Sequence, residues 1–420
     1  MTLLDCVVVG AGHAGLAIAS CLQEQGRDFV VLERGRVAET WRSQRWDSFQ
    51  VNTPNWMNLL PGQELRGAPR DGFLRRDELV RGFERYAEAR ALPVTAGVAV
   101  TMVAHDDAAA TFVVRGTQSG GGPVSWRSRS VVVAAGLQRA PKLPGFGREL
   151  PPGMAQLHSA QYLAPEFLPP GAAVVVGSAQ SGCQIAEDLL AAGRTVYLCA
   201  SRVARVPRRH RGRDITEWWV EAGFFDQTVA DLEDPAMRLI PQPQVSGVGP
   251  RGHTVSLQQL ARNGALLLGR TLGVNEGRLE LDGRLGAYVR FADERSAKFQ
   301  EEIDAAILRA GGALPADEDD AADVPAPELY DVSGPAELDL RAAGVGAIIW
   351  CTGFTADFGW LRLPVLDARG APVHEGGVSP VPGLYFLGFP WLRTRKSGII
   401  FGAADDAARI AEAVGQHLAA

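Results

Sequence analysis

The sequence of 420 residues is poor in cysteine, and its cysteines form no recognisable reactive arrangement. No Cys-x-x-Cys pair occurs, which argues against a dithiol–disulfide reductase. No spacing of Cys, His, Asp and Glu indicates a metal site, so we expect no metal. An odd number of scattered cysteines favours a reducing compartment, and we therefore expect a cytoplasmic protein. The five are Cys6, Cys21, Cys183, Cys199 and Cys351.

Long apolar runs and a large excess of one charge are also missing. No apolar run approaches the ~18 residues of a membrane-spanning helix, and the first ten residues contain Asp5 and lead directly into a strand. We expect neither a membrane span nor a signal peptide. The formal net charge of −6 gives no support for nucleic-acid binding. With 46% hydrophobic and 21% charged residues, the chain can form two or three globular domains.

Glycine, by contrast, is abundant, with 48 residues, and one glycine-rich pattern occurs twice. The first copy begins with the apolar strand expected at Val7–Val9. A helix over Leu16–Gln25 and a strand over Phe29–Leu32 are predicted to follow. Between strand and helix stand three glycines in G-x-G-x-x-G spacing, which permits a tight turn, close approach of the backbone to a pyrophosphate, and close helix–strand packing. They are Gly10, Gly12 and Gly15.

Glu33 follows the second strand of this copy. An acid at this position hydrogen-bonds a ribose 2′-hydroxyl, while the free N–H groups at the start of the helix favour the phosphates. The first copy therefore predicts a dinucleotide site of the FAD or NAD type. The alternative, a glycine-rich turn in some other α/β protein, does not explain Glu33.

The second copy keeps the register of the first without a gap. Its middle glycine is replaced by Ala179, and the position of Glu33 is taken by Ala200, with Ser201 and Arg202 next. Without the acid, a ribose 2′-phosphate is not repelled, and a serine and an arginine can bind it. This copy predicts an NADPH site; a solvated surface charge is the alternative for Arg202. The glycines aligned with Gly10, Gly15 and Gly26 are Gly177, Gly182 and Gly193.

Two further apolar strands end in small residues, at Ser130–Gly136 and Ala347–Gly353, and their ends are expected to abut the cofactors. The predicted fold class is α/β, with two Rossmann-like dinucleotide-binding domains, FAD and NADPH, the second inserted in the first. Residues 1–160 and 336–420 are expected to form the FAD domain, and residues 161–335 the NADPH domain. The latter contains a variable helical middle segment, at about residues 205–335, that includes a helix near Glu294–Leu308 and that the sequence does not otherwise place. The strand-end residues predicted to bind cofactor are Ala135, Gly136, Cys351, Thr352 and Gly353.

Two charge clusters lie in the second domain. Arginines are dense from position 202 to 213, and their position after the NADPH strand favours phosphate binding over nucleic-acid binding, although one or two arginines suffice. The acidic run Asp317–Asp323 is interpreted as a solvated loop.

Taken together, the two glycine loops and four further stretches resemble the class B flavin-dependent monooxygenases, in particular the bacterial flavin-containing-monooxygenase-like branch. The family fingerprint F-x-G-x-x-x-H-x-x-x-[F/Y] is matched at Gly153, His158 and Tyr162, with one extra residue between glycine and histidine and no leading aromatic. A tyrosine at position 162 favours this branch over the related Baeyer–Villiger enzymes. The four stretches are Thr40–Gly62, Pro141–Tyr162, Ile349–Phe354 and Gly383–Ala407.

The resemblance implies an FAD- and NADPH-dependent enzyme. In that family NADPH reduces FAD, oxygen gives a C4a-(hydro)peroxyflavin, and one oxygen atom passes to a small molecule, here expected at nitrogen or sulfur. The expected partners are a small-molecule substrate and O2, with no nucleic acid and no membrane. One alternative is Baeyer–Villiger or oxidative-decarboxylating chemistry on a carbonyl substrate. Another is an NADPH oxidase, reductase or redox-sensing flavoprotein without oxygen insertion.

The resemblance also implies residue roles. Asn52 is the candidate catalytic residue, a preorganised donor beside the oxygen adduct; an asparagine in a turn before Pro54 is the alternative. His158 is interpreted as a hinge residue rather than a base, and the His13 imidazole as packing within a loop that lines the cofactor. Near the flavin or its phosphates we expect His13, Ala14, Arg34, Thr40, Trp41, Arg42, Trp46, Gly388, Ser397, Gly398 and Ile399. Near the NADPH pyrophosphate we expect Gly177, Ala179, Gln180, Ser181 and Gly182.

Overall fold

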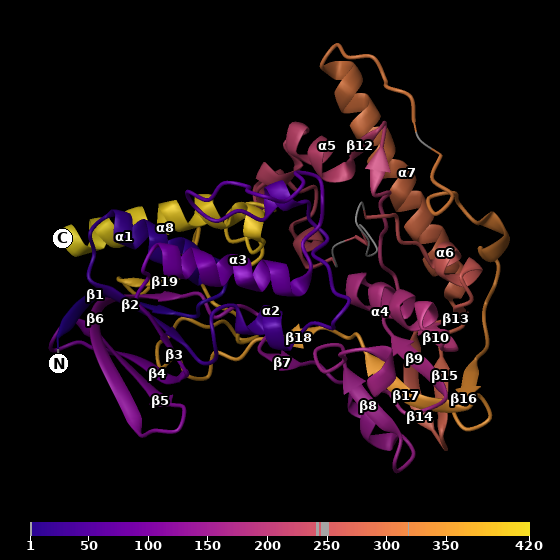
Figure 1. The fold of residues 1–420 in the computed structure, drawn as a ribbon, viewed down its shortest axis with the longest axis horizontal. Helices are drawn as coiled ribbons and strands as arrows, with labels where there is room; N and C mark the ends of the chain where they lie inside the picture. The colour runs from indigo at the N-terminus through magenta and orange to yellow at the C-terminus, as the bar shows by residue number, and fades with distance from the viewer. Residues whose placement is uncertain (1, 241–242, 245–251, 318) are drawn as a thin grey trace.

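The computed structural model describes residues 2–240, 243–244, 252–317 and 319–420. Two sheets lie one after the other along the long axis of the molecule (Figure 1). Both chain ends lie at the end of the molecule that carries the first sheet. Among the described helices, none combines the length and apolarity needed to span a membrane.

The first sheet has seven strands and contains the first glycine loop. β1 pairs in parallel with β2 and β6, and the pairs Val9↔Leu32 and Val9↔Val133 align the carboxyl ends of these strands. β4, β5 and β6 form an antiparallel extension. The order is β3(Val94–Ala96), β2(Phe29–Glu33), β1(Leu3–Val9), β6(Pro123–Val133), β5(Thr111–Gln118) and β4(Val98–Asp106), with β19(Leu384–Phe386) also paired to β6.

The second sheet has five strands, all parallel, and contains the second glycine loop. Val176 pairs with both Cys199 and Trp350, so the carboxyl ends of these strands are again aligned. Buried apolar side chains, most of them valine and isoleucine, fill the two central strands, as expected for a sheet covered on both faces. The order is β13(Leu266–Leu268), β10(Val196–Cys199), β9(Ala172–Val176), β17(Val345–Trp350) and β8(Ala155–His158).

The chain leaves the first sheet after β6, builds the second sheet, and returns to the first at β19. This confirms the predicted fold class, with one dinucleotide-binding unit inserted in the other. The expected boundaries had assigned β8 and β17 to the first domain, which was wrong for these two strands, since both are hydrogen-bonded in the second sheet. An apolar strand can be recognised from its own residues, but its partners depend on the whole chain. The other domain limits stay a prediction.

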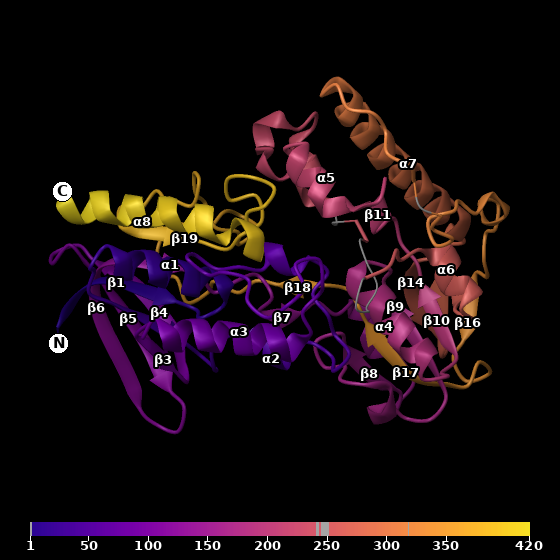
Figure 2. The same ribbon diagram turned by 45° about the horizontal axis from the view of Figure 1, so that its top comes forward.

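The helices cover the sheets and extend beyond them. α1 contacts α8 and α3 beside the first sheet, and α4 contacts β9, β10 and α6 beside the second. α5 lies above the junction of the two sheets, and α7 runs from near α5 to α6 (Figures 1 and 2). The helices are α1(His13–Glu24), α2(Glu39–Ser43), α3(Arg76–Ala89), α4(Gln180–Ala191), α5(Ile215–Glu221), α6(Leu257–Arg262), α7(Leu285–Arg309) and α8(Ala403–Ala419).

Three small strand groups complete the described strands. β7(Ala140–Pro141) pairs with β18(Phe354–Thr355) where the chain crosses between the sheets. β14(Thr271–Asn275), β15(Arg278–Leu281) and β16(Glu337–Asp339) form an antiparallel sheet. β11(Arg209–His210) and β12(Arg213–Asp214) form a short hairpin directly before α5 in the chain.

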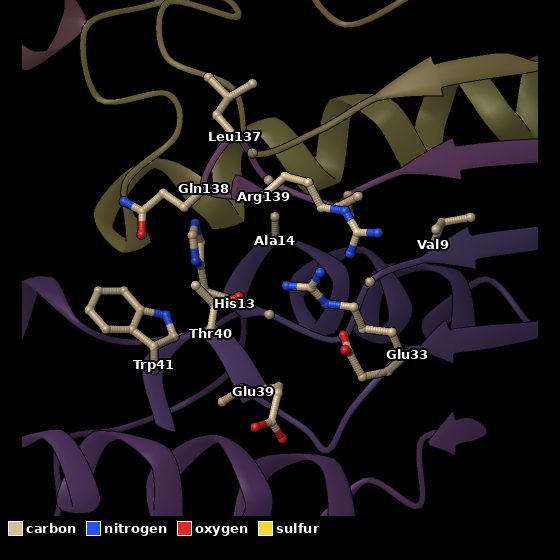
Figure 3. Close-up of a pocket in the computed structure, with 18 of the residues that line it drawn as sticks. Val9, His13, Ala14, Glu33, Glu39, Thr40, Trp41, Leu137, Gln138 and Arg139 are labelled. Carbon is tan, nitrogen blue, oxygen red and sulfur yellow. The ribbon is translucent and has the colours of Figure 1, made fainter. Parts of the chain in front are cut away.

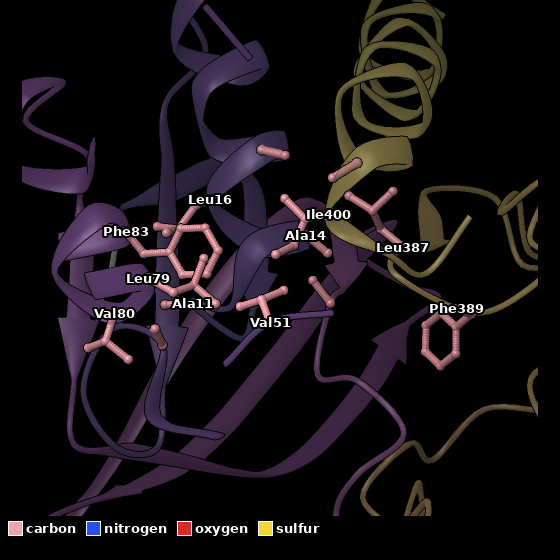
Figure 4. Packing of buried hydrophobic residues seen from close by; sticks show 14 of the residues in the cluster. Ala11, Ala14, Leu16, Val51, Leu79, Val80, Phe83, Leu387, Phe389 and Ile400 are labelled. Carbon is pink, nitrogen blue, oxygen red and sulfur yellow. The ribbon is translucent and has the colours of Figure 1, made fainter. Parts of the chain in front are cut away.

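The largest buried cluster holds the first glycine loop in place. Ala11, Ala14 and Leu16 belong to it together with Phe83 of α3 and Ile400, and Figure 4 shows these side chains converging from separate segments. Full burial of each large apolar side chain stabilises the fold by roughly 1.5–3 kcal/mol. The loop that approaches a ligand is therefore backed by a packed core on its other side.

A separate aromatic cluster attaches the middle segment to the first domain. Trp219 of α5 contacts the rings of Phe225 and Phe299, with centroids 6.0 Å apart in both pairs. Met57 and the partly buried Phe401, both from the first domain, pack against the same cluster. The middle segment thus folds back over the residues that precede α8.

Candidate functional site

The first glycine loop has no room for a side chain at two positions. Gly10 has φ +108°, and a Cβ there would lie 2.5 Å from the carbonyl oxygen of Ala134. A Cβ on Gly15 would lie 1.8 Å from the carbonyl oxygen of Gly10. Gly12, the N-cap of α1, has φ −80° and open space around it. The first and last glycines therefore close the turn, and the middle one leaves room in front of the helix.

Glu33 is buried at the end of β2, with 8% of its surface exposed. Its carboxylate accepts hydrogen bonds from the backbone N–H of Ala11, at 2.8 Å, and of Gly35, at 2.9 Å. Burial raises the pKa of Glu33, and these two donors oppose the rise by favouring the charged form. The carboxylate is thus held against the glycine loop, with accepting capacity left for a ligand hydroxyl.

A cavity of about 390 Å³ extends from Glu33 along the glycine loop to Trp41 and Asn52. Figure 3 shows Val9 and Glu33 at one end and His13, Trp41 and Gln138 at the other. The structure brings most of the predicted first-site residues to its wall. They are Gly10, Gly12, His13, Ala14, Glu33, Arg34, Thr40, Trp41, Asn52, Ala135, Gly136, Gly388, Gly398 and Ile399.

Four predicted first-site residues have other surroundings. Gly15 lies within α1 against Gly10. Trp46 is buried in the core, edge-on to the ring of Phe49. Arg42 forms an ion pair with Glu84 of α3. Ser397 is also buried, and its hydroxyl accepts from the N–H groups of Arg393 and Thr394, both at 3.2 Å.

Sequence reasoning missed Arg45, which also lines the cavity. Its Nη2 donates to Oε1 of Gln138 at 2.7 Å, and its guanidinium lies 5.2 Å from the centre of the Trp41 ring. Burial lowers the pKa of Arg45 to about 10. Its proximity to Trp41 in sequence was a usable signal. Gln138 and Arg139, which also line the cavity, follow the predicted residue Gly136 closely in sequence. Val98–Val100 line the cavity as well, and they come from a segment without any such signal.

His13 stands at the first position of α1 with its Nε2 atom lacking a hydrogen-bond partner among the described residues. Burial lowers the pKa of His13 to about 4, so the imidazole is neutral at physiological pH. It therefore adds no positive charge to the helix N-terminus that faces the cavity.

Asn52 lies on the cavity wall in a segment held on both sides. The N–H of Val51 donates to the carbonyl of Leu74 at 2.9 Å, and the side chain of Asn58 donates to the carbonyl of Thr53 at 2.9 Å. The carbonyl oxygen of Asn52 itself accepts from Arg208 at 2.8 Å. These bonds hold the backbone of Asn52 while its side chain stays half-exposed to the cavity.

The cavity fits a flavin dinucleotide on three observations. The loop leaves no room for a Cβ at Gly10 but open space at Gly12, where a pyrophosphate would approach. The N–H groups of the first turn of α1 face this space, and no side chain of the described residues caps this helix at its N-cap. The buried carboxylate of Glu33 stands where a ribose hydroxyl needs an acceptor.

The second loop repeats this backbone. Gly177 has φ +108°, and a Cβ there would lie 2.7 Å from the carbonyl oxygen of Cys351. A Cβ on Gly182 would lie 1.8 Å from the carbonyl oxygen of Gly177. Ala179 is the N-cap of α4 with φ −76°, a conformation open to any residue, which explains why alanine is accepted there. Gln180 and Ser181 follow in the first turn.

Arg202 is exposed beyond the end of β10, with its guanidinium 4.2 Å from the centre of the Phe291 ring. Ser201 is half-buried beside it, and its N–H donates to the hydroxyl of Ser178 at 3.0 Å. Cys351 and Thr352 follow β17, where burial raises the pKa of the Cys351 thiol to about 12. The pair Ser201–Arg202 is thus available to an incoming anion, and the Cys351 thiol stays protonated at neutral pH.

The crossing between the sheets contains the predicted hinge residue. His158, 1% exposed, has its Nε2 2.8 Å from the carbonyl oxygen of Gly353, and its Nδ1 accepts from the N–H of Ala160. Its ring lies 4.8 Å from that of Phe354. Tyr162 donates to Asp188 of α4 at 2.6 Å. His158 therefore links the end of β8 to the segment that follows β17, and it does not line the cavity. The hinge role stays a prediction.

Most arginines of the cluster after β10 form ion pairs inside the protein. Arg205 pairs with Asp293 and Asp323, and Arg211 pairs with Asp304. The interpretation of Asp317–Asp323 as a solvated loop was wrong for Asp323, because this carboxylate faces a buried guanidinium; Glu318 lies outside the described residues. Clusters of opposite charge far apart in sequence neutralise each other here, whereas Arg202 stays exposed beside the second loop.

The comparisons with known proteins agree with this geometry. Residues 7–213 match the family model described as pyridine nucleotide-disulphide oxidoreductase. The chain is 28% identical over 414 residues, 96% of either chain, to an uncharacterized oxidoreductase, CzcO-like, of Geobacillus kaustophilus. It is 27% identical to the indole-3-pyruvate monooxygenase YUCCA1 of rice (Oryza sativa), over 73% of this chain and 76% of that protein.

Solved structures share the fold of the whole chain. A flavin-containing monooxygenase from Stenotrophomonas maltophilia superposes with a TM-score of 0.65 at 18% identity and covers 100% of both chains. The protein OTEMO, solved in complex with FAD and NADP, superposes with a TM-score of 0.57 at 15% identity, over 98% of this chain and 85% of OTEMO. Through residues 7–213 the chain is similar to the pyridine nucleotide-disulphide oxidoreductase family, and as a whole it has the fold of the flavin-containing monooxygenases.

Proposed function

We propose that the protein is an FAD- and NADPH-dependent monooxygenase that transfers one atom of O2 to the nitrogen or sulfur of a small molecule. The reaction consumes one NADPH, one proton and one O2 per substrate, and yields the oxygenated product, NADP⁺ and water. The observation that carries the proposal is a single cavity lined by Glu33, a buried acceptor for a ribose hydroxyl, and by Asn52, whose backbone is fixed by a hydrogen bond from Arg208. The same chain contains a second glycine loop whose unit lacks the acid.

The chain's own residues divide the work as follows. Glu33 would hold the ribose of FAD, and the first turn of α1 its pyrophosphate. Ser201 and Arg202 would bind the 2′-phosphate of NADPH. Bound FAD would supply the redox chemistry, accepting a hydride from NADPH and passing the electrons to O2. Asn52 would donate a hydrogen bond at the reacting end, where a preorganised donor is most effective.

Water exclusion is the second task of such a site, because reduced oxygen is otherwise released as peroxide. The Arg45–Gln138 hydrogen bond spans two segments of the cavity wall, and the Trp41 ring lies beneath the guanidinium. The aromatic cluster around Trp219 lies over the segment that contributes Ile399 to the wall. These contacts support a closed reaction chamber.

One observation favours a second candidate function, oxidative decarboxylation or Baeyer–Villiger oxidation of a carbonyl compound. The rice relative is named for indole-3-pyruvate, a 2-oxo acid, and it matches nearly three quarters of this chain. The same cofactors would serve both chemistries, so the substrate decides between them.

The test is oxygen-isotope incorporation. The purified yellow protein is mixed with NADPH, ¹⁸O₂ and one of four probes: methyl phenyl sulfide, N,N-dimethylaniline, cyclohexanone or indole-3-pyruvate. We expect one ¹⁸O atom in the sulfoxide or N-oxide, with NADPH consumed in proportion and little peroxide. Label in the products of the carbonyl probes alone favours the second candidate. Stoichiometric peroxide with all four probes would contradict both and favour an oxidase or a redox sensor.

A further inference from the structure

Arg208 belongs to the segment after β10 but reaches into the first domain. Its side chain is 1% exposed, and its Nη1 donates to the carbonyl oxygen of Asn52 at 2.8 Å. Its guanidinium also lies 4.6 Å from the centre of the ring of Phe73, a buried residue of the first domain. A buried cation from the inserted domain thus ends on the cavity segment of the other domain.

The position of this guanidinium is fixed by Asp214. Nε of Arg208 donates to Oδ2 of Asp214 at 2.7 Å and Nη2 donates to Oδ1 at 2.6 Å, a two-point contact that sets the plane of the group. Asp214 also accepts from the N–H of Thr216 at 2.9 Å and caps α5. The N–H of Arg208 donates to the hydroxyl of Thr254 at 2.7 Å. The arginine therefore has little freedom to move without its own domain.

The bond to Asn52 differs in origin from the two beside it. Leu74 and Asn58, which hold Val51 and Thr53, come from the same domain as Asn52. Arg208, in contrast, belongs to the inserted domain, and it holds Asn52, the residue between Val51 and Thr53. Because a backbone hydrogen bond fixes the peptide plane, it also limits where the Asn52 side chain can point. A shift of the inserted domain would be transmitted directly to this residue.

We propose that Arg208 is a positioning residue, which aims the side-chain amide of Asn52 into the cavity and makes that aim depend on the position of the inserted domain. The proposal rests on the proposed function for the role of Asn52, but the contact itself does not. The second nucleotide would therefore affect the first site through a hydrogen bond as well as through direct contact.

Arg205 provides a matched control within the same segment. It is also 1% exposed and also bonds a buried aspartate, with Nε and Nη2 at 2.9 and 2.6 Å from Oδ1 of Asp293. Its other partners, Ser296 and Asp323, belong to the middle segment. Replacing either arginine by lysine keeps the charge and removes the planar fork. The two variants should therefore lose similar stability and differ in their effect on Asn52.

The experiment compares Arg208→Lys, Arg205→Lys and Asn52→Ala in the FAD-loaded protein. The measurements are the thermal midpoint, the visible circular dichroism of the bound flavin with and without NADP⁺, and the peroxide released per NADPH. We expect Arg208→Lys to change the visible dichroism and to raise peroxide release several-fold, towards the level of Asn52→Ala. Arg205→Lys should match the native protein in both. The double variant Arg208→Lys/Asn52→Ala should release no more peroxide than Asn52→Ala alone, since both act through one residue.

Identical dichroism and peroxide release in Arg208→Lys and Arg205→Lys would overturn the proposal, whatever the loss of stability. If Asn52→Ala leaves peroxide release unchanged, the function assigned to Asn52 fails, and altered dichroism in Arg208→Lys still supports positioning. If Arg208→Lys does not fold, Asp214→Asn replaces it, because the amide keeps the size of the carboxylate and weakens its hold on the guanidinium. We expect a smaller change in the same direction, and an unchanged spectrum would count against positioning.

Discussion

The two glycine loops of this protein have the same backbone and different side chains. Gly10 and Gly177 share a φ of +108°, and the N-caps Gly12 and Ala179 differ by only a few degrees in φ. Each loop begins a helix of 12 residues. The two units also differ in the hydrogen bond that connects the glycine loop to the end of the second strand.

In the first unit this link runs from the loop to the strand end, since the N–H of Ala11 donates to the carboxylate of Glu33. In the second unit the direction is reversed. Ser178, which aligns with Ala11, accepts from the N–H of Ser201 through its hydroxyl at 3.0 Å. A serine in the loop thus does the bridging that the acid does in the first unit. The loss of the acid at Ala200 therefore leaves the backbone unchanged and changes only what a ligand meets.

This difference has its largest expected consequence at Glu33. Glu33→Ala removes the ribose acceptor and leaves the N–H groups of Ala11 and Gly35 without their partner. Hydrogen bonds to a charged group contribute about 1.5–3 kcal/mol each, so we expect the FAD dissociation constant to rise by roughly 100-fold. Flavin content after purification and titration of the flavin-free protein measure it. Glu39 is a neighbouring acid on the same cavity wall, and the control variant Glu39→Ala should keep its flavin. A fully loaded Glu33→Ala protein would remove the assignment of the first loop.

An intermediate effect is expected at Arg202, beside the second glycine loop. Arg202→Ala should raise the KM for NADPH by roughly tenfold and leave the KM for NADH unchanged, because a single exposed charge–phosphate contact contributes about 1.4 kcal/mol. Steady-state flavin reduction with both nucleotides measures it. Arg213→Ala serves as the control, since Arg213 pairs with Glu217 and Glu221. An equal change for NADPH and NADH would return Arg202 to a surface charge.

The smallest effect on stability is expected at Ala179, where the two loops carry different residues in nearly the same backbone conformation. Ala179→Gly places the first loop's residue in the second, at a φ of −76° that either residue adopts. The free energy of unfolding should change by less than about 0.5 kcal/mol in urea titrations. Gly182→Ala is the contrasting variant, because its Cβ would lie 1.8 Å from a backbone oxygen, and it should unfold at much lower urea. A large loss in Ala179→Gly would mean that the two loops are not equivalent.

Local patterns predicted the two units well because each unit is local. A strand, a glycine turn, a helix and a second strand follow within about 30 residues, and the two strands of each unit, β1 with β2 and β9 with β10, pair within that stretch. The helix expected at Leu16–Gln25 is α1, His13–Glu24. The helix expected near Glu294–Leu308 is the second half of α7, which begins at Leu285. Its first half is more deeply buried, so an amphipathic pattern is weaker there.

The parts that were missed depend on contacts across the chain. β17 carries an apolar run that any parallel sheet would accept, and only its neighbours β9 and β8 decide that it belongs to the second sheet. Gln138 and Arg45 meet on the cavity wall and form a hydrogen bond, although they are 93 residues apart in sequence. Arg208 belongs to an arginine cluster whose sequence position favours phosphate binding, and only the structure shows that it is buried between Asp214 and the carbonyl of Asn52.

The sequence by itself determined two nucleotide-binding units and the chemical difference between them, because glycine spacing and the residue after the second strand act within one short segment. Only the tertiary structure decided which strands share a sheet, which charges neutralise one another, and which residues meet around the cavity. Burial of charge explains why. A buried guanidinium requires an anion and a well-placed acceptor, and both are supplied by residues whose distance in sequence carries no information about their distance in space.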